Sequence, residues 1–156
     1  MAEEMKESWW KEKAWITQYH FKEEEPTAFN LLGAFICNVV LRSPEAVITA
    51  GNLPPRVIHF FINHPKRGRE NVVLMLTPMA VFEGEPEEEP DVILDCDYYD
   101  FVAILGGEKD VMDMVWSGEI TLSGNTIVGM DLKDILDASA GKAPMERPAA
   151  WSIGVP

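Results

Sequence analysis

The segment from residue 91 to residue 125 decides the fold, and it reads DVILDCDYYDFVAILGGEKDVMDMVWSGEITLSGN. Apolar residues alternate over 91–96, which is typical of a strand buried on one side. The apolar stretches 98–105 and 111–117 each follow an aspartate and precede a glycine. Aspartate caps the start of a helix, and glycine commonly ends one. The segment therefore predicts one strand followed by two short helices that begin after Asp97 and Asp110.

The end of this segment predicts one more strand and one more helix. Ile120 and Leu122 alternate with polar residues, which indicates a half-buried fifth strand. Gly124 and Asn125 favour a tight turn. Apolar residues recur at helical spacing after the turn, so we expect a last helix over roughly 126–138.

Upstream of residue 91, the pattern predicts two helices and then a meander of three strands. Helical periodicity runs from residue 28 to residue 40 behind a Thr27 cap, and Ser43-Pro44 starts a second helix that closes at Gly51. β-Branched and aromatic residues then mark strands over 56–63, 71–77 and 80–82. The acidic stretch 83–90 is expected to be a solvated loop.

The order of elements indicates an α+β fold with a five-stranded mixed, mainly antiparallel sheet and helices packed on one face. We expect an N-terminal aromatic extension over 1–26, a single domain over 27–141 and an irregular tail over 142–156. The stretch 8–21 fits helix and strand equally well. Its tryptophans leave three alternatives open, namely docking on the domain itself, a homodimer contact, or transient membrane contact helped by nearby lysines.

Composition excludes several classes of partner. The chain has 156 residues, a formal net charge of −13 and a sequence pI near 4.5, so it should repel nucleic acid and anionic lipid surfaces. Cys37 and Cys96 each lie in an apolar run, which predicts two buried, reduced thiols and a cytoplasmic location. The acidic start is unlike a secretory signal, and no apolar run reaches the roughly 18 residues of a membrane span.

The segment 91–136 resembles the sterol carrier protein 2 family. The resemblance rests on Asp91 to Asp97, on the Asp100-Phe101 helix with Gly107, and on the run Ser117-Gly118-Glu119-Ile120-Thr121-Leu122-Ser123-Gly124-Asn125. The sequence departs from the family pattern at Asp110-Val111, where the family often has Asn-Pro, and in the absence of lysines from the fifth strand. The resemblance covers about 100 residues, strongly in the last half of the chain.

The resemblance implies that a sterol, fatty acid, fatty acyl-CoA or phospholipid lies between the sheet and the helices. A methionine-rich and aromatic surface suits such a ligand because methionine adapts its shape to varied apolar partners. The candidate lipid-binding residues are Phe101, Leu105, Val111, Met112, Met114, Val115, Trp116, Ile127, Met130 and Ile135.

The sequence offers little support for an enzyme. The three histidines and two cysteines show no metal-ligand spacing, and no nucleophile elbow, phosphate loop or dinucleotide fingerprint is present. We therefore expect a non-catalytic, lipid-binding protein that needs no cofactor. The alternative is an interaction or enzyme-accessory domain with the same fold and a filled cavity.

Overall fold

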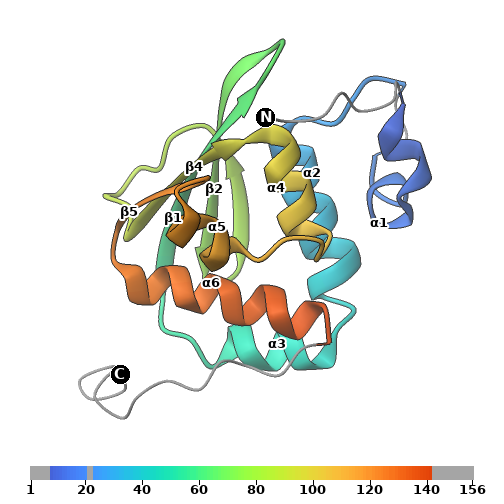
Figure 1. The fold of residues 1–156 in the computed structure, drawn as a ribbon. Coiled ribbons are helices and arrows are strands. Elements are labelled where there is room, and N and C mark those ends of the chain that lie inside the picture. The colour runs from blue at the N-terminus through green and yellow to red at the C-terminus, as the bar shows by residue number, and fades with distance from the viewer. Residues whose placement is uncertain (1–7, 21–22, 142–156) are drawn as a thin grey trace.

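The computed structural model describes residues 8–20 and 23–141, in which a five-stranded sheet carries helices on one face (Figure 1). The helical elements are η1 (Trp9–Glu12), α1 (Ala14–Thr17), α2 (Ala28–Phe35), η2 (Ile36–Val40), α3 (Pro44–Gly51), α4 (Tyr98–Leu105), α5 (Val111–Ser117) and α6 (Thr126–Ser139). The strands are β1 (Arg56–His64), β2 (Gly68–Leu76), β3 (Ala80–Glu83), β4 (Val92–Asp97) and β5 (Thr121–Gly124).

The sheet has the order β3-β2-β1-β4-β5, so the predicted α+β class with a mixed, mainly antiparallel sheet is confirmed. Strands β1, β2 and β3 form the expected antiparallel meander, and β1 pairs with β4 in parallel. Alternation along the strands sends one set of side chains, such as Ile58, Phe60 and Leu94, into the core under the helices. The other set includes His59, whose Nε2 lies 3.0 Å from the Oδ1 of Asn71 on the outer face.

The N-terminal segment (residues 8–20) forms short helical turns, which resolves the helix-or-strand ambiguity; Phe21 lies outside the described residues. Trp9 and Trp10 are each only 5% exposed and belong to the hydrophobic core cluster. The Trp9 ring meets the rings of Tyr98 and Tyr99 edge to face, with centroids 6.2 and 6.1 Å away. Trp9 and Trp10 therefore pack on the domain itself, which is the first of the three alternatives given for the N-terminal tryptophans.

Two of the three predicted aspartate and threonine caps are confirmed. The side chain of Thr27 accepts a hydrogen bond from the Asn30 amide at 3.1 Å, and Asp110 accepts from the Met112 and Asp113 amides. Helix α4 does begin after Asp97, which is its N-cap residue, but the Asp97 side chain makes no capping hydrogen bond, so that part of the prediction is wrong. Asp97 is also the last residue of β4, where it pairs with Asn63.

The last turn confirms the need for glycine at position 124. Gly124 has φ +104°, and a Cβ there would lie 2.6 Å from the carbonyl oxygen of Asp91. Asn125 then accepts a hydrogen bond from the Ile127 amide at 2.9 Å and starts α6, one residue longer than expected. This turn places α6 across the sheet.

One expectation about the cysteines needs correction. Cys96 is buried, but Cys37 is exposed because its turn of η2 faces solvent. Both thiols are free. Within residues 8–20 and 23–141, no single helix is long and apolar enough to cross a membrane. The helices Ala28–Val40 and Pro44–Gly51 reach that length and apolar composition only when taken together, and they are bent by 110° at the break between them.

Candidate functional site

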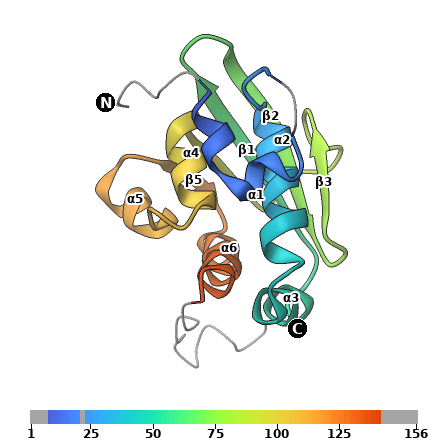
Figure 2. The same ribbon diagram turned by 90° about the vertical axis from the view of Figure 1, so that its right-hand side faces the viewer.

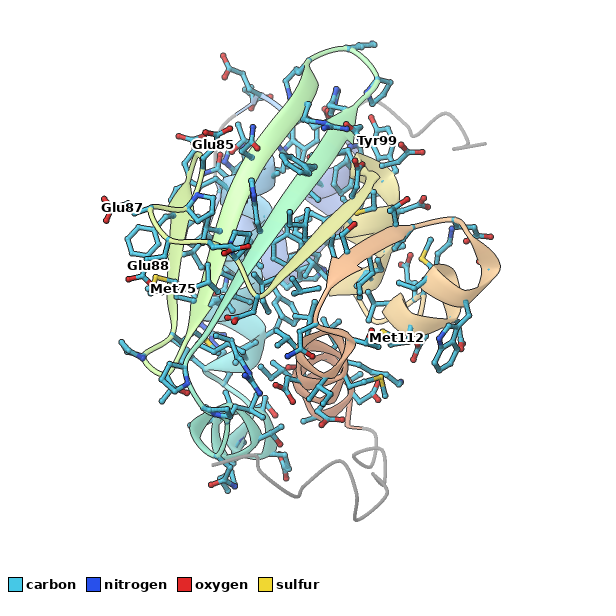
Figure 3. The ribbon with its side chains drawn as sticks, turned by 90° about the vertical axis from the view of Figure 1, so that its left-hand side faces the viewer. Met75, Glu85, Glu87, Glu88, Tyr99 and Met112 are labelled. Atoms are coloured by element: carbon cyan, nitrogen blue, oxygen red, sulfur yellow. The ribbon has the colours of Figure 1, made fainter. Side chains whose placement is uncertain are left out.

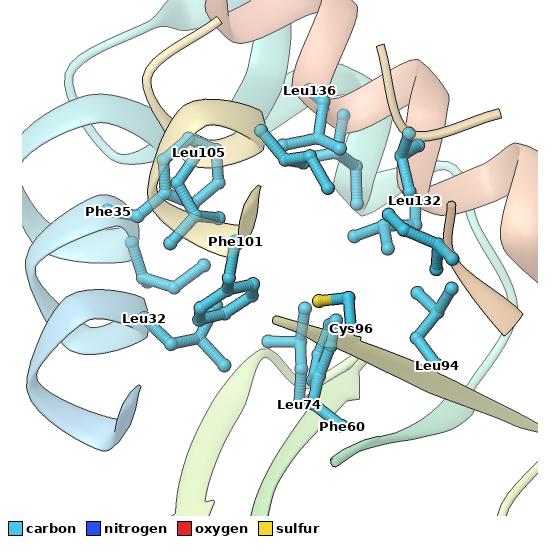
Figure 4. Close-up of a pocket in the computed structure, with 15 residues that line it drawn as sticks. Leu32, Phe35, Phe60, Leu74, Leu94, Cys96, Phe101, Leu105, Leu132 and Leu136 are labelled. Atoms are coloured by element: carbon cyan, nitrogen blue, oxygen red, sulfur yellow. The ribbon is translucent and has the colours of Figure 1, made fainter. Parts of the chain in front are cut away.

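An apolar cavity lies between the inner face of the sheet and helices α2, α4 and α6 (Figure 4). It has a volume of about 20 Å³, which leaves room for about one water-sized sphere. Its lining contains no charged side chain and consists of Leu32, Phe35, Ile36, Phe60, Leu74, Leu94, Cys96, Phe101, Ile104, Leu105, Val111, Ile120, Leu132, Ile135 and Leu136.

The cavity wall combines strand residues with one face of each helix. The rings of Phe60 on β1 and Phe101 on α4 pack with centroids 5.3 Å apart. Cys96 on β4 points into the same space (Figure 4). Burial and the nearby carboxylates of Asp100, Asp95 and Asp97 raise the pKa of the Cys96 thiol far above its ordinary value. The thiol therefore stays protonated and acts as a small apolar side chain.

Four of the ten predicted lipid-binding residues line this cavity, namely Phe101, Leu105, Val111 and Ile135. The other six lie elsewhere: α5 reaches the cavity only through its first residue, Val111, and α6 reaches it through Leu132, Ile135 and Leu136 rather than through Ile127 or Met130. Met112, Met114 and Met130 are buried outside the cavity wall, Val115 and Ile127 are half-buried, and Trp116 is 67% exposed. The Sδ of Met112 lies 3.7 Å from where a Cβ on Gly129 would be, so this methionine packs on α6.

Sequence reasoning missed most of the cavity wall because it considered only the C-terminal helices. Most of the missed residues carry a detectable signal, since they are inward-facing positions of β1, β2 and β4 or apolar positions at helical spacing on α2, α4 and α6. They are Leu32, Phe35, Ile36, Phe60, Leu74, Leu94, Cys96, Ile104, Ile120, Leu132 and Leu136.

A polar cluster, here called the Glu25 network, holds the N-terminal segment beside this cavity. The Glu25 carboxylate accepts hydrogen bonds from Trp9 Nε1 at 2.5 Å and from the Tyr99 hydroxyl at 3.0 Å, and it also pairs with His64 Nε2. His64 Nδ1 in turn accepts from the backbone amides of Lys66 and Arg67. The proton of a neutral His64 therefore sits on Nε2, directed at Glu25.

The contacts of the Glu25 network shift the pKa values of Glu25 and Tyr99. Burial alone would raise the pKa of Glu25, but the hydrogen bonds from Trp9, His64 and Tyr99 outweigh it and leave that pKa below its ordinary value. Burial and the adjacent Glu25 carboxylate raise the pKa of Tyr99 to about 12. Glu25 therefore remains an anion that holds three donors from distant parts of the chain.

On the opposite side of the cavity, one lysine bridges α6 to the start of α5. Lys133 on α6 donates to Asp110 Oδ2 at 2.5 Å and to Asp137 Oδ2 at 2.8 Å. Burial lowers the pKa of Lys133, but the two carboxylates raise it by more. Helix α5, which begins after Asp110, contacts chiefly α6 and stands at the edge of the molecule (Figure 2).

A metal centre is not suggested by the side chains that the structure describes. Among them, no group of three or more His, Cys, Asp or Glu residues is arranged to hold a metal ion. The apolar cavity is thus the feature with the clearest chemistry, which is the burial of hydrocarbon.

Comparison with solved structures places the fold among sterol carrier proteins. The palmitated SCP2L2 of Aedes aegypti is 25% identical, with a TM-score of 0.51 over 65% of this chain and 90% of that chain. The sterol carrier protein domain 2 of Helicoverpa armigera is 18% identical, with a TM-score of 0.58 over 79% and 98% of the two chains. A sec-alkyl sulfatase, PisA1, is 12% identical, with a TM-score of 0.51 over 79% of this chain and only 17% of that chain. The last two show the fold alone, and the sulfatase shows that this fold also occurs inside an enzyme.

A comparison with curated proteins finds no match. A family model described as the SCP-2 sterol transfer family matches residues 42–137, which is more than half of the chain and includes every strand of the sheet. This chain therefore belongs to the SCP-2 sterol transfer family, a family of lipid-binding and lipid-transfer domains.

Proposed function

We propose that the protein binds one fatty acyl chain in the cavity between the sheet and helices α2, α4 and α6, and carries it without catalysing a reaction. The observation that carries this proposal is the cavity wall of fifteen apolar side chains in a chain of the SCP-2 sterol transfer family. A wall without ionised groups is suited to hydrocarbon and offers no acid, base or nucleophile for catalysis.

The cavity must widen before it holds an acyl chain, because about 20 Å³ is too small for one. Each buried methylene contributes roughly 0.8 kcal/mol, so ten of them supply about 8 kcal/mol before the cost of ordering the chain. That free energy can offset the displacement of a short helix. Helix α5 is the candidate for this movement, because it is seven residues long and contacts chiefly α6.

A linear acyl chain suits this interior better than a rigid sterol does. It can follow a narrow space between side chains, whereas a fused ring system needs a wide space at once. The palmitated form of the Aedes aegypti relative, 25% identical to this chain, supports the same ligand class. We propose the cytoplasm as the location because Cys37 and Cys96 are free thiols; immunolocalisation to a secretory compartment would contradict that placement.

The test compares two valine substitutions on α5. Val111 lines the cavity, whereas Val115 lies on the same helix outside the cavity wall. Val111→Phe should therefore weaken binding of a fluorescent fatty acid by about tenfold, as expected for a loss of about 1.4 kcal/mol. Val115→Phe should leave the affinity unchanged. Circular dichroism and urea denaturation establish that both variants fold.

Three results would contradict the proposal. They are equal effects of the two valine substitutions, no fatty acid uptake by the unsubstituted protein, or native mass spectra that show only the bare chain after incubation with palmitate.

The small cavity favours a second candidate function, an interaction or enzyme-accessory domain with a filled interior. A closed core of about 20 Å³ is what such a domain would have. This candidate predicts no uptake of fatty acid, sterol or phospholipid, together with a stable homodimer or hetero-complex in sedimentation velocity. A monomer that takes up palmitate at one-to-one stoichiometry would exclude it.

A further inference from the structure

The face of the sheet opposite to helices α2 and α4 carries a second hollow, here called the outer hollow (Figure 3). It has a volume of about 270 Å³ and lies where strands β1, β2 and β3 meet the acidic loop after β3. It shares no residue with the apolar cavity, and its lining consists of Val57, Val73, Met75, Phe82, Glu83, Glu85, Pro86, Glu87 and Glu88.

The base of the outer hollow is apolar because of the strand register. Val57 on β1 lies opposite Met75 on β2, and Val73 on β2 lies opposite Phe82 on β3. Cross-strand partners share one face of a sheet, so these four side chains lie side by side on the outer face. Val73 is buried beneath the others, Val57 and Met75 are half-buried, and Phe82 is 51% exposed. Phe82, with parts of Val57 and Met75, is therefore available to a partner.

The border of the outer hollow is strongly acidic. Glu83, Glu85, Glu87 and Glu88 are all exposed and all line the hollow. Glu87 and Glu88 lie near Met75 in Figure 3, and Glu85 lies farther along the sheet. Within residues 8–20 and 23–141, none of these four carboxylates takes part in an ion pair. Four unpaired carboxylates on a chain of net charge −13 attract a cationic partner and repel an anionic one.

The shape of the outer hollow distinguishes a protein partner from a small molecule. Small-molecule pockets usually have volumes of roughly 300–1,000 Å³ and enclose most of the ligand. The outer hollow is smaller, and its border residues and Phe82 remain exposed. It therefore fits one large apolar side chain whose neighbours stay at the surface, beside the carboxylates.

We propose that the outer hollow binds a basic segment of a partner protein, in which an apolar side chain is flanked by lysine or arginine. The apolar side chain covers Met75 and Phe82, and the flanking cations pair with Glu85, Glu87 and Glu88. This interaction surface is separate from the lipid cavity, and a carrier could use it to meet a donor or acceptor protein while its ligand stays enclosed.

The experiment follows the methionine methyl signals of the full-length protein by NMR during titration with a synthetic peptide, KKLWKK. The Met75 signal should shift saturably, and the Met112 signal, which arises on the other side of the molecule (Figure 3), should not. The control peptide EELWEE should shift neither signal. Phe82→Ala should weaken binding without unfolding the protein, because that side chain is half exposed.

Two variants with the same net charge distinguish binding of the peptide at the outer hollow from a general attraction between the basic peptide and the acidic protein. The triple variant E85Q/E87Q/E88Q should weaken binding of the peptide by about tenfold, since each exposed ion pair contributes up to about 1 kcal/mol. The triple variant E12Q/E45Q/E119Q removes the same charge from exposed positions outside the hollow, where screening reduces its effect on the peptide. Its affinity should stay close to that of the unsubstituted protein.

Three results would overturn the proposal. They are equal weakening by the two triple variants, no shift of the Met75 signal with KKLWKK, or a saturable Met75 shift with dodecylammonium and none with the peptide, which would assign the hollow to small amphiphilic cations.

Discussion

The two sides of the helical layer are held to the rest of the molecule in different ways. On the N-terminal side, Glu25 joins Trp9, His64 and Tyr99 through hydrogen bonds that span up to 74 positions in sequence. On the α5 side, Lys133 alone bridges two carboxylates, and Trp116 on α5 lies 67% exposed. We therefore propose that the interior opens at α5, where fewer polar bonds hold the helix, while the N-terminal side stays closed.

The largest effect should come from removing the carboxylate at the centre of the Glu25 network. Glu25→Ala leaves three donors without their acceptor, and we expect it to lower the free energy of unfolding by about 2–4 kcal/mol. Urea denaturation measures this loss, and hydrogen exchange over residues 9–18 should speed up. The matched control is Glu24→Ala, whose exposed side chain makes no such bonds. Equal losses in the two variants would refute the idea that the N-terminal side is pinned by Glu25.

A smaller effect is expected at the ion pairs on the α5 side. Lys133→Met leaves Asp110 and Asp137 unpaired, and because these groups are partly exposed we expect a loss of about 1–2 kcal/mol. Uptake of a fluorescent fatty acid in stopped-flow measurements should become faster, because α5 is released. Lys109→Met breaks the exposed pair with Asp100 and serves as the control. If both variants take up lipid at the unsubstituted rate, α5 is not the moving element.

Acidification should lower the free energy of unfolding by protonating Glu25, although some of its hydrogen bonds remain. The pKa of Glu25 in the folded protein lies below its ordinary value of 4.5, so its charge stabilises the fold above that value. This contribution is lost as the pH falls through the lowered pKa. The effect should be weaker than that of Glu25→Ala, because a protonated carboxyl still accepts hydrogen bonds.

The measurement is unfolding free energy against pH, from pH 6 to pH 3, for the unsubstituted protein and for Glu25→Gln. The unsubstituted chain should lose more stability over this range. Parallel curves for the two proteins would show that Glu25 contributes nothing to the acid response.

The smallest effect is expected at Trp116. Because its ring is 67% exposed, Trp116→Ala should change the free energy of unfolding by no more than about 0.5 kcal/mol. Thermal denaturation followed by circular dichroism tests this. A loss above about 1 kcal/mol would mean that Trp116 packs against the protein, and that α5 is held more firmly than we infer.

The fold was largely predictable because its signals are local. Alternation in Val92–Asp97, the cap at Asp110 and the glycine at position 124 depend on neighbouring residues, and each predicted an element that the structure contains. Asp97 was correctly placed before α4, but it makes no capping hydrogen bond, and its pairing with Asn63 across the sheet was not predicted. Pairing between strands is a long-range property that local patterns do not contain.

The site was less predictable because it depends on which helix face meets the sheet. Met112 and Met114 were predicted to bind lipid, but both are buried outside the cavity wall. The role of Glu25 was not predicted either, because it ends a run of three glutamates that is typical of a solvent-exposed loop. Its role appears only when Trp9, His64 and Tyr99 come together in the folded chain.

We propose that the apolar interior opens at α5 to admit an acyl chain, and the position of bound palmitate, determined by NMR, tests this opening. The protein is saturated with uniformly ¹³C-labelled palmitate, and contacts between the acyl chain and protein methyl groups are recorded. We expect contacts with the methyl groups of Val111 and Ile135, which line the cavity, and none with the exposed Ile48 of α3. Contacts confined to surface methyl groups such as those of Ile48, or the absence of bound palmitate, would contradict it.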